Sequence, residues 1–424
     1  MSARTLLLAA TTAFGVAAAV AILRVTEVSE PRLTLPVERP ARTRPTAMRQ
    51  TTVTTGQGAP TTQLSDTTAS SPPGGGTTIS AGLAYRWSPI AGVDEFSAPD
   101  AGGGLTAVAA VEGEGLIAVG GSRDAPLVLV SPDGLGWSRV DAAEEDLQGA
   151  ALRDVAVVDG RLVAVGSLRG APAAWTSLDA VQWSRVPVTD PANELGVGLL
   201  EALAQSPDGS VFAVGFSPGS AGIWALHDGR FEPESSARTP SVGQVLSDVV
   251  STSKGVVAAG NDAEGQPIAL RSTGEGTWST AVLPAEGGRA SVAALGEIGD
   301  VVVAVGYGVP GPLVWSSADA QSWSAVTAPT TSPGRPAGLY AVAPGPGGAL
   351  AGGQRPGGPL CSSSTDGTSW SECDGEDGLR TAAVRDLLAV GAGFVAVGTS
   401  TPEDGQAGPA IWHVEREPRA AQAR

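Results

Sequence analysis

The chain has 424 residues, a formal net charge of −17 and a single lysine, Lys254. Nucleic-acid binding needs a basic face for the phosphates, so this composition argues against a nucleic-acid partner. Two cysteines and two histidines are too few for a zinc cluster, and we expect neither a metal nor another cofactor.

An uncharged apolar run, TLLLAATTAFGVAAAVAIL, occupies residues 5–23. As a helix it would span about 28 Å, close to the thickness of a bilayer core. We favour a signal anchor over residues 1–24, although AVA at 19–21 resembles a cleavage site and a signal peptide is the alternative. A core helix of a soluble domain is less favoured, because no partner helices follow. The arginines after the run favour a cytoplasmic downstream chain, but long domains override this bias.

Residues 25–83 are rich in Thr, Ser, Pro and Gly and have no apolar periodicity. Such a segment buries too little surface to offset its ordering entropy. We expect a disordered stalk, glycosylated or plain, that raises a domain above the membrane. The predicted location is therefore extracytoplasmic, with the chain anchored in the membrane, or secreted if the apolar run is cleaved. Residues 416–424 are expected to be a disordered tail.

One pattern returns seven times from residue 105 onward. Two alternating apolar strands end at a glycine, and a third strand, a tight turn and a fourth strand with Trp follow. The closing glycines are Gly120, Gly166, Gly215, Gly260, Gly306, Gly353 and Gly398, spaced 45 to 49 residues apart. Four short strands per unit at this period indicate a β-propeller blade. The fold class is all-β, and we predict a seven-bladed β-propeller of four-stranded blades over residues 84–415.

The seventh unit lacks its fourth strand, because it ends near residue 415 after three strands. The stretch AYRWSPI at 84–90 resembles a fourth strand without its repeat. We predict that Tyr85–Ile90 pairs with the strand around Ala410–Val414 and closes the ring. Closure removes two exposed sheet edges, whereas an open solenoid would need polar capping repeats.

The turn between the third and fourth strands resembles the Asp-box of sialidase-like propellers, also called the BNR repeat, with the pattern Ser-x-Asp-x-Gly-x-x-Trp. Two boxes here are one residue shorter, and two others lack the glycine. The residues are Ser131, Asp133, Gly134 and Trp137; Ser364, Asp366, Gly367 and Trp370; Ser177, Asp179 and Trp183; and Ser317, Asp319 and Trp323. The resemblance implies a structural role for the boxes. It also suggests a sialidase-like glycoside hydrolase or a carbohydrate-binding propeller as an alternative function.

Cys361 and Cys373 flank the sixth hairpin, and a turn centred on Gly367 places them opposite each other. Opposed residues of a hairpin are within disulfide range, whereas a register centred on Asp366 would leave them diagonal. We predict a disulfide bond, which also indicates an oxidising compartment.

Three aspartates, Asp154, Asp248 and Asp386, occupy one position of the innermost strands in LRDV, LSDV and VRDL. They either line the central channel or, as we favour, bond to backbone or to a neighbouring Arg153 or Arg385. Tyr340 lies on an inner strand beside the channel and Tyr85 on an outer strand. Neither belongs to a recognisable arginine trio, so we assign no catalytic residue.

The long connections between repeats are acidic and variable. Their residues include Asp141, Glu144, Glu145, Asp146, Asp190, Glu194, Asp374, Glu376 and Asp377. Variable loops on a rigid frame often carry function. We predict either an acidic binding face for a cationic partner or weak calcium binding, or charges that only keep the protein soluble. The favoured function is a monomeric, non-catalytic binding or assembly scaffold for a protein or glycan ligand.

Overall fold

The alternating apolar residues of the repeat form antiparallel β-strands. The computed structural model describes residues 85–96, 103–122, 125–141, 146–190, 196–234, 244–272, 277–285, 289–309, 311–327, 337–356, 358–373, 382–401 and 407–417. These residues all belong to one compact unit. The predicted anchor, stalk and C-terminal tail lie outside the described residues, apart from Arg416 and Glu417. Within the described part, no helix is long and apolar enough to cross a membrane.

Four of the sheets follow the repeat directly, with four strands each in sequence order. They are β2 (Leu105–Val111), β3 (Gly115–Ser122), β4 (Ala125–Ser131) and β5 (Ser138–Arg139); β6 (Ala150–Val158), β7 (Arg161–Leu168), β8 (Ala171–Ser177) and β9 (Ser184–Val186); β10 (Leu199–Gln205), β11 (Val211–Phe216), β12 (Ile223–His227) and β13 (Arg230–Pro233); and β14 (Val245–Thr252), β15 (Gly255–Asn261), β16 (Pro267–Ser272) and β17 (Trp278–Val282).

The next two repeats share one sheet of eight strands. Its strands are β18 (Ala290–Ile298), β19 (Val301–Gly308), β20 (Pro312–Ser317), β21 (Ser324–Val326), β22 (Gly338–Gly345), β23 (Gly348–Arg355), β24 (Gly358–Ser364) and β25 (Ser371–Glu372). A single residue pair, Tyr307 and Gly338, joins the two sets of four. The described strands therefore form five separate four-stranded sheets and one eight-stranded sheet, rather than the seven separate sheets predicted.

The fifth four-stranded sheet joins the two ends of the described chain, as predicted. It contains β26 (Ala382–Val390), β27 (Gly393–Ser400), β28 (Gly408–Arg416) and β1 (Tyr85–Pro89). Tyr85 pairs with Arg416 and Pro89 with Trp412, so β28 runs slightly beyond the predicted end. A 3-10 turn at Asp94–Phe96 follows β1. Tyr85 is buried and packs edge-on against Phe394 at 6.2 Å between ring centroids.

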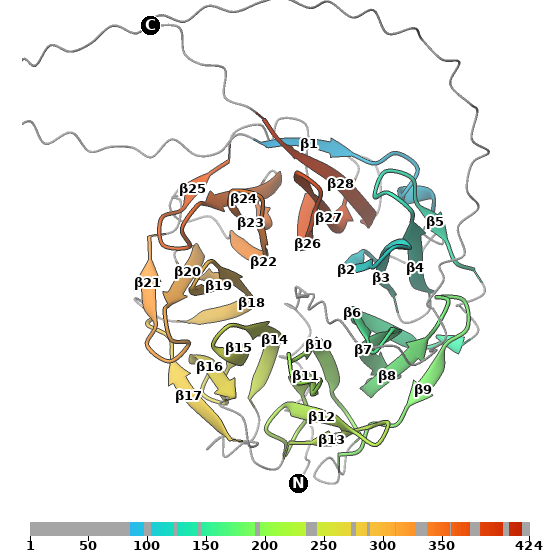
Figure 1. The fold of residues 1–424 in the computed structure, drawn as a ribbon, viewed down its shortest axis with the longest axis horizontal. Helices are drawn as coiled ribbons and strands as arrows, with labels where there is room; N and C mark the ends of the chain where they lie inside the picture. The colour runs from blue at the N-terminus through green and yellow to red at the C-terminus, as the bar shows by residue number, and fades with distance from the viewer. Residues whose placement is uncertain are drawn as a thin grey trace, which may run out of the picture. The chain divides into compact units, whose positions relative to one another are not determined.

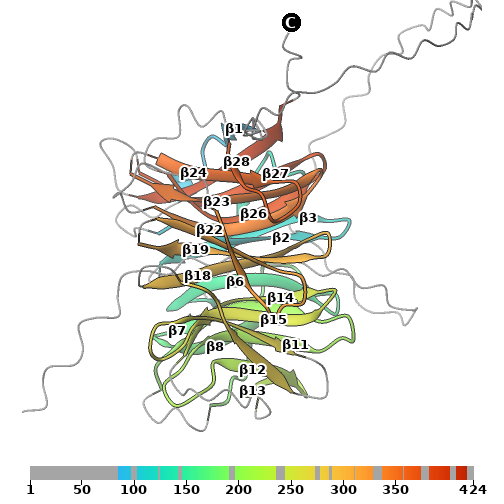
Figure 2. The same cartoon turned by 90° about the vertical axis from the view of Figure 1, so that its left-hand side faces the viewer.

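The sheets are arranged in a ring, and β2, β6, β10, β14, β18, β22 and β26 are the strands nearest its centre (Figure 1). Each of these innermost strands contacts the next, and β26 contacts β2, so the contacts form a closed cycle. Turned by 90°, the same sheets are seen stacked on one another (Figure 2). The fold is all-β and propeller-like.

Every innermost strand has a β-bulge near its start. In β6 the register shifts between Leu152 and Asp154, which makes Arg153 the extra residue. The same shift occurs in the other six innermost strands. The recurring glycine opposite the bulge has a steric reason: a Cβ on Gly166 would lie 2.1 Å from the carbonyl oxygen of Ala151. A bulge bends the strand and redirects the extra side chain.

Tryptophan supplies much of the core between the repeats. All ten tryptophans are buried, including Trp175, Trp224, Trp315 and Trp412 on the third strands. Trp175 packs in one cluster with Ile117 and Val130 of the preceding repeat. These tryptophans therefore pack in the core between neighbouring repeats.

Candidate functional site

The three predicted aspartates are buried and accept backbone hydrogen bonds. Asp154 Oδ1 accepts from the amide of Val155 at 2.6 Å, and its Oδ2 accepts from Leu203 on β10 at 2.8 Å. Asp248 and Asp386 are bonded in the same way, the first to β18 through Leu295 and the second to β2 through Val108. Each carboxylate therefore links its own bulge to the innermost strand of the next repeat.

This arrangement supports the structural interpretation of the trio over a channel site. Burial raises the pKa of Asp154 and Asp248 well above the usual range, while the backbone hydrogen bonds oppose that shift. Within the described residues, the three aspartates do not form a group that could hold a metal ion. The receiving strands have alanine at the position equivalent to the aspartate, directly after the bulge: Ala202, Ala294 and Ala107.

The extra residues of the bulges are a second set around the centre of the ring, and the sequence interpretation did not single them out together. In ring order they are Thr106, Arg153, Glu201, Ser247, Ala293, Tyr340 and Arg385. Polar or aromatic groups occupy six of the seven, and Ala293 is the exception. Only the LRDV and VRDL motifs gave a signal for them, because each places an arginine directly before the buried aspartate.

Arg153 and Glu201 form an ion pair between neighbouring innermost strands. Arg153 Nε lies 3.6 Å from Glu201 Oε2, and their side chains are 28% and 1% exposed. Neither carboxylate oxygen of Glu201 accepts a hydrogen bond from the described residues. Burial raises the pKa of Glu201 and the charge of Arg153 opposes this. A buried carboxylate held by one ion pair is poorly compensated.

Arg385 lies on β26, the innermost strand that flanks β2 on the side away from Arg153, and it packs against a pair of tyrosines. Its guanidinium is 4.9 Å from the ring centre of Tyr340, and Tyr340 meets Tyr307 edge-on at 5.7 Å. Burial lowers the pKa of Arg385, and repulsion from the Arg153 charge lowers it further. We call Arg153, Glu201, Tyr307, Tyr340 and Arg385 the inner-strand cluster.

In all four Ser-x-Asp boxes the aspartate accepts hydrogen bonds from the two amides that follow the turn, and in three of them the tryptophan Nε1 also donates to a turn carbonyl. In the first repeat, Asp133 Oδ1 accepts from the amides of Leu135 and Gly136 at 2.8 and 3.0 Å. Ser131 Oγ accepts from Gly134 at 2.8 Å, and Trp137 Nε1 donates to the Gly134 carbonyl at 3.1 Å. These bonds, all within the turn, fit the structural role that the resemblance implies.

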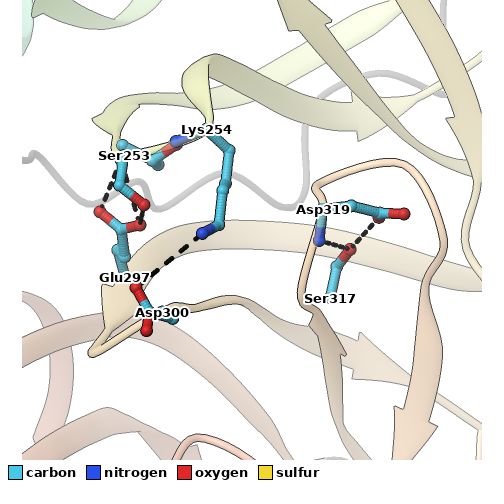
Figure 3. Close-up of polar contacts among 7 residues, drawn as sticks. Ser253, Lys254, Glu297, Asp300, Ser317 and Asp319 are labelled. Atoms are coloured by element: carbon cyan, nitrogen blue, oxygen red, sulfur yellow. Dashed lines mark hydrogen bonds and ion pairs between the residues drawn. The ribbon is translucent and has the colours of Figure 1, made fainter.

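The two boxes without glycine place alanine in the left-handed conformation instead. Ala180 has φ of 60° and Ala320 has φ of 58°. Asp179 still binds the amides of Val181 and Gln182, both at 2.9 Å. In the box of Figure 3, Ser317 donates to Asp319 at 3.0 Å. A related Ser-x-Asp turn, which the repeat pattern did not predict, lies between β10 and β11, where Asp208 accepts from Ser210 N at 3.0 Å.

Neighbouring repeats are also joined at the hairpins between first and second strands. Figure 3 shows Glu297, on the hairpin of β18 and β19, accepting hydrogen bonds from Ser253 on the hairpin of β14 and β15. Beside it, Lys254 Nζ lies 3.9 Å from Asp300 Oδ1, whose side chain is 96% exposed. These contacts link the hairpins of two neighbouring repeats, and we assign no binding site to them.

Cys361 and Cys373 form a disulfide bond, with Cα atoms 5.4 Å apart. Ser362 pairs with Glu372 and Ser363 with Ser371, which is the register centred on Gly367. The diagonal register is therefore wrong, and the geometry predicted for the bond is the one observed.

The acidic residues of the connections are only partly within the described residues. Asp141 pairs with Arg139 at 3.1 Å, and Asp146 Oδ2 accepts from the amide of Trp183 at 2.8 Å. Asp190 has buried oxygens that accept no hydrogen bond from the described residues. Glu144, Glu145, Glu194, Asp374, Glu376 and Asp377 lie outside the described residues. A common acidic face stays a prediction.

Comparison with known proteins bears on the fold. No family model and no curated protein matches the chain. Among solved structures it is similar to the extracellular domain of a hybrid two-component system from B. thetaiotaomicron, with a TM-score of 0.52 and 10% identity over 79% of this chain and 40% of that one. It therefore spans about two fifths of that protein's length. At this identity the likeness shows the fold alone.

Two glycoside hydrolases are also among the structural neighbours. An ancestral GH74 enzyme has a TM-score of 0.49 and 12% identity, with 75% of this chain and 49% of that chain covered. The sialidase of Trypanosoma rangeli has a TM-score of 0.40 and 13% identity, with 62% and 55% covered.

Proposed function

We propose that this chain is an extracytoplasmic propeller that binds a small carboxylate-bearing ligand at the inner-strand cluster without catalysis. The observation that carries the proposal is the placement of Arg153 and Arg385 at equivalent bulges of two innermost strands, on either side of the bulge at Thr106. Of these two arginines, Arg153 alone has a carboxylate partner among the described residues. Guanidinium groups bind carboxylates through paired hydrogen bonds, so these two arginines are suited to hold a carboxylate ligand.

The aromatic part of the cluster favours a ligand with a flat or apolar body. Tyr307 and Tyr340 are half-buried beside Arg385, so each offers partly exposed ring surface next to the cation. Tyrosine combines apolar area with a polar end, which suits an amphipathic small molecule. The protein as a whole has a formal net charge of −17, so a carboxylate ligand would be attracted by the guanidinium groups of Arg153 and Arg385 themselves and not by the overall field.

Binding is favoured over glycoside hydrolysis by the state of the candidate reactive groups. Most glycosidases use two carboxyl groups that flank the bond to be cleaved. The cluster contains one carboxyl group, Glu201, and it is buried against Arg153. Burial raises the pKa of Tyr340, so its hydroxyl stays protonated at neutral pH, whereas a nucleophile needs activation.

We extend the proposal to the number of blades and to the nature of the Ser-x-Asp turns. We treat the eight-stranded sheet as two neighbouring blades, which gives seven blades, because one residue pair alone joins its halves. We relate the Ser-x-Asp turns to the Asp-boxes of BNR propellers because their hydrogen bonds repeat in four boxes. Such a ring would serve as a scaffold that presents a ligand site or a protein partner on one face, acting as a monomer.

An oxidising location is supported by the disulfide bond, since such bonds are rare in the cytosol. We propose that residues 5–23 anchor the chain in the membrane and that residues 25–83 are its stalk. Cell fractionation followed by N-terminal sequencing tests this. Membrane-bound protein that retains residue 5 supports an anchor, whereas soluble cytoplasmic protein with free thiols contradicts both proposals.

The binding proposal is tested by calorimetry with benzoate and D-glucuronate, against the neutral analogues benzamide and D-glucose. We expect the carboxylates alone to bind, and the R153Q/R385Q variant to lose at least tenfold in affinity. R161Q is the matched control, because Arg161 is exposed at the start of β7, outside the cluster. Equal binding of neutral analogues, or no loss in R153Q/R385Q, contradicts the proposal.

A further inference from the structure

The position of Glu201 has a consequence for how the proposed site responds to pH, and this inference rests on the proposed function. Glu201 is 1% exposed, lies 3.6 Å from Arg153 and accepts no hydrogen bond from the described residues. Arg153 is 28% exposed and so is open on its other side. An anion that binds Arg153 there must share the guanidinium charge with Glu201.

We infer that Glu201 takes up a proton when an anionic ligand binds the inner-strand cluster. In the free protein, the Arg153 cation is what favours the charged form of this buried carboxylate. A bound anion neutralises that cation and adds a negative charge nearby. Both effects favour the neutral carboxyl group, which the buried position of Glu201 already favours. Binding and protonation of Glu201 are therefore coupled and strengthen each other.

The groups packed around Glu201 leave Arg153 as its main electrostatic partner. β10 lies between β6 and β14 in the ring and also contacts β7, β8 and β11. On β6 the charged groups are Arg153 and Asp154, and Asp154 is bonded to Val155 and Leu203. On β14 the charged group is Asp248, which is bonded to Val249 and Leu295. On β7 it is Arg161, exposed at the start of the strand, and β8 and β11 carry no charged residue. Both aspartates are anionic when ionised and so also favour a neutral Glu201.

The direction of the pH dependence follows from the linkage. Below the pKa of Glu201 in the free protein, the residue is already neutral and affinity is highest. Between the pKa values of the free and the bound protein, one proton enters per ligand and affinity falls up to tenfold per pH unit. Above the pKa of the bound state, affinity reaches its lower plateau. The site would thus bind carboxylates more tightly at lower pH and release them as the pH rises.

The test measures benzoate and D-glucuronate affinity by calorimetry from pH 5 to pH 8 in two buffers with different heats of ionisation, which also counts protons. Wild type is expected to take up protons and to weaken as pH rises. E201Q keeps the side-chain shape without the charge, so it is expected to bind as tightly as wild type at low pH, with no proton uptake. E112Q is the control, because Glu112 is exposed in the hairpin between β2 and β3.

The outcomes separate this inference from the proposed function. Binding that depends on both arginines, but with the same pH slope in wild type and E201Q, overturns the coupling and leaves the proposed function standing. Equal binding by wild type and R153Q/R385Q, or no binding of either carboxylate, overturns both the coupling and the proposed function. If E201Q fails to fold, E201D provides the second variant: its shorter side chain is expected to weaken the ion pair and reduce the pH slope.

Discussion

The Oδ2 atom of Asp154 accepts a 2.8 Å hydrogen bond from the amide of Leu203, so one carboxylate joins the innermost strands of two consecutive repeats. Asp248 and Asp386 do the same at two further junctions. In the three receiving repeats the position carries alanine. Six of the seven repeats therefore form three pairs, each with an aspartate in one repeat and an alanine at the same position in the next. The repeat of β22–β25, which has Ala341 at this position, belongs to no pair.

Asp154→Ala is expected to destabilise the protein by about 2–4 kcal/mol, because two buried amides, those of Val155 and Leu203, lose their acceptor. Urea unfolding at pH 7 measures this. Asp300→Ala is the control, because Asp300 is exposed and makes a long surface ion pair with Lys254, at 3.9 Å. It is expected to change stability by less than about 0.5 kcal/mol. Equal midpoints for the two variants would mean that the junction bond does not matter.

The repeat, the ring closure and the disulfide register could be predicted because each can be recognised from the residue pattern within one repeat. Alternation gives the strands, the missing fourth strand gives the closure, and the hairpin symmetry about Gly367 gives the cysteine pair. The inner-strand cluster could not be predicted in the same way. Its members lie in different repeats, and only the bulge, which shifts the register by one residue, brings Glu201 next to Arg153.

Removal of the first strand is expected to open the ring. Deletion of residues 1–91 removes β1 and leaves β28 with an unpaired edge, exposing Trp412 and Val414, which are now 2% and 0% exposed. Deletion of residues 1–80 keeps β1. Thermal melting and size-exclusion chromatography are expected to show a lower Tm and self-association for the first truncation alone. Identical melting of both would contradict closure by β1.

Loss of the disulfide bond is expected to lower the free energy of unfolding by about 3 kcal/mol, because Cys361 and Cys373 close a loop with a sequence separation of 12 residues. The C361S/C373S variant measured by urea unfolding tests this. Wild type unfolded with a reductant present serves as the control and should match the variant. A variant as stable as oxidised wild type would show that the hairpin holds without the bond.

The Ser-x-Asp turns predict a dependence of stability on acid. Hydrogen bonds from Ser322 and Gln321 lower the pKa of Asp319 below its usual value of 3.8. A carboxylate whose pKa is lower in the folded state stabilises the fold above the unfolded pKa, and this contribution disappears as pH falls through the folded pKa. Asp319→Asn keeps the acceptor oxygen but not the charge. We therefore expect a small decrease in Tm at pH 7 that shrinks toward pH 2.

Asp300→Asn, also on an exposed turn (Figure 3), is expected to show almost no difference at either pH. A Tm difference for Asp319→Asn that stays constant with pH would mean that the charge on Asp319 does not contribute to the turn.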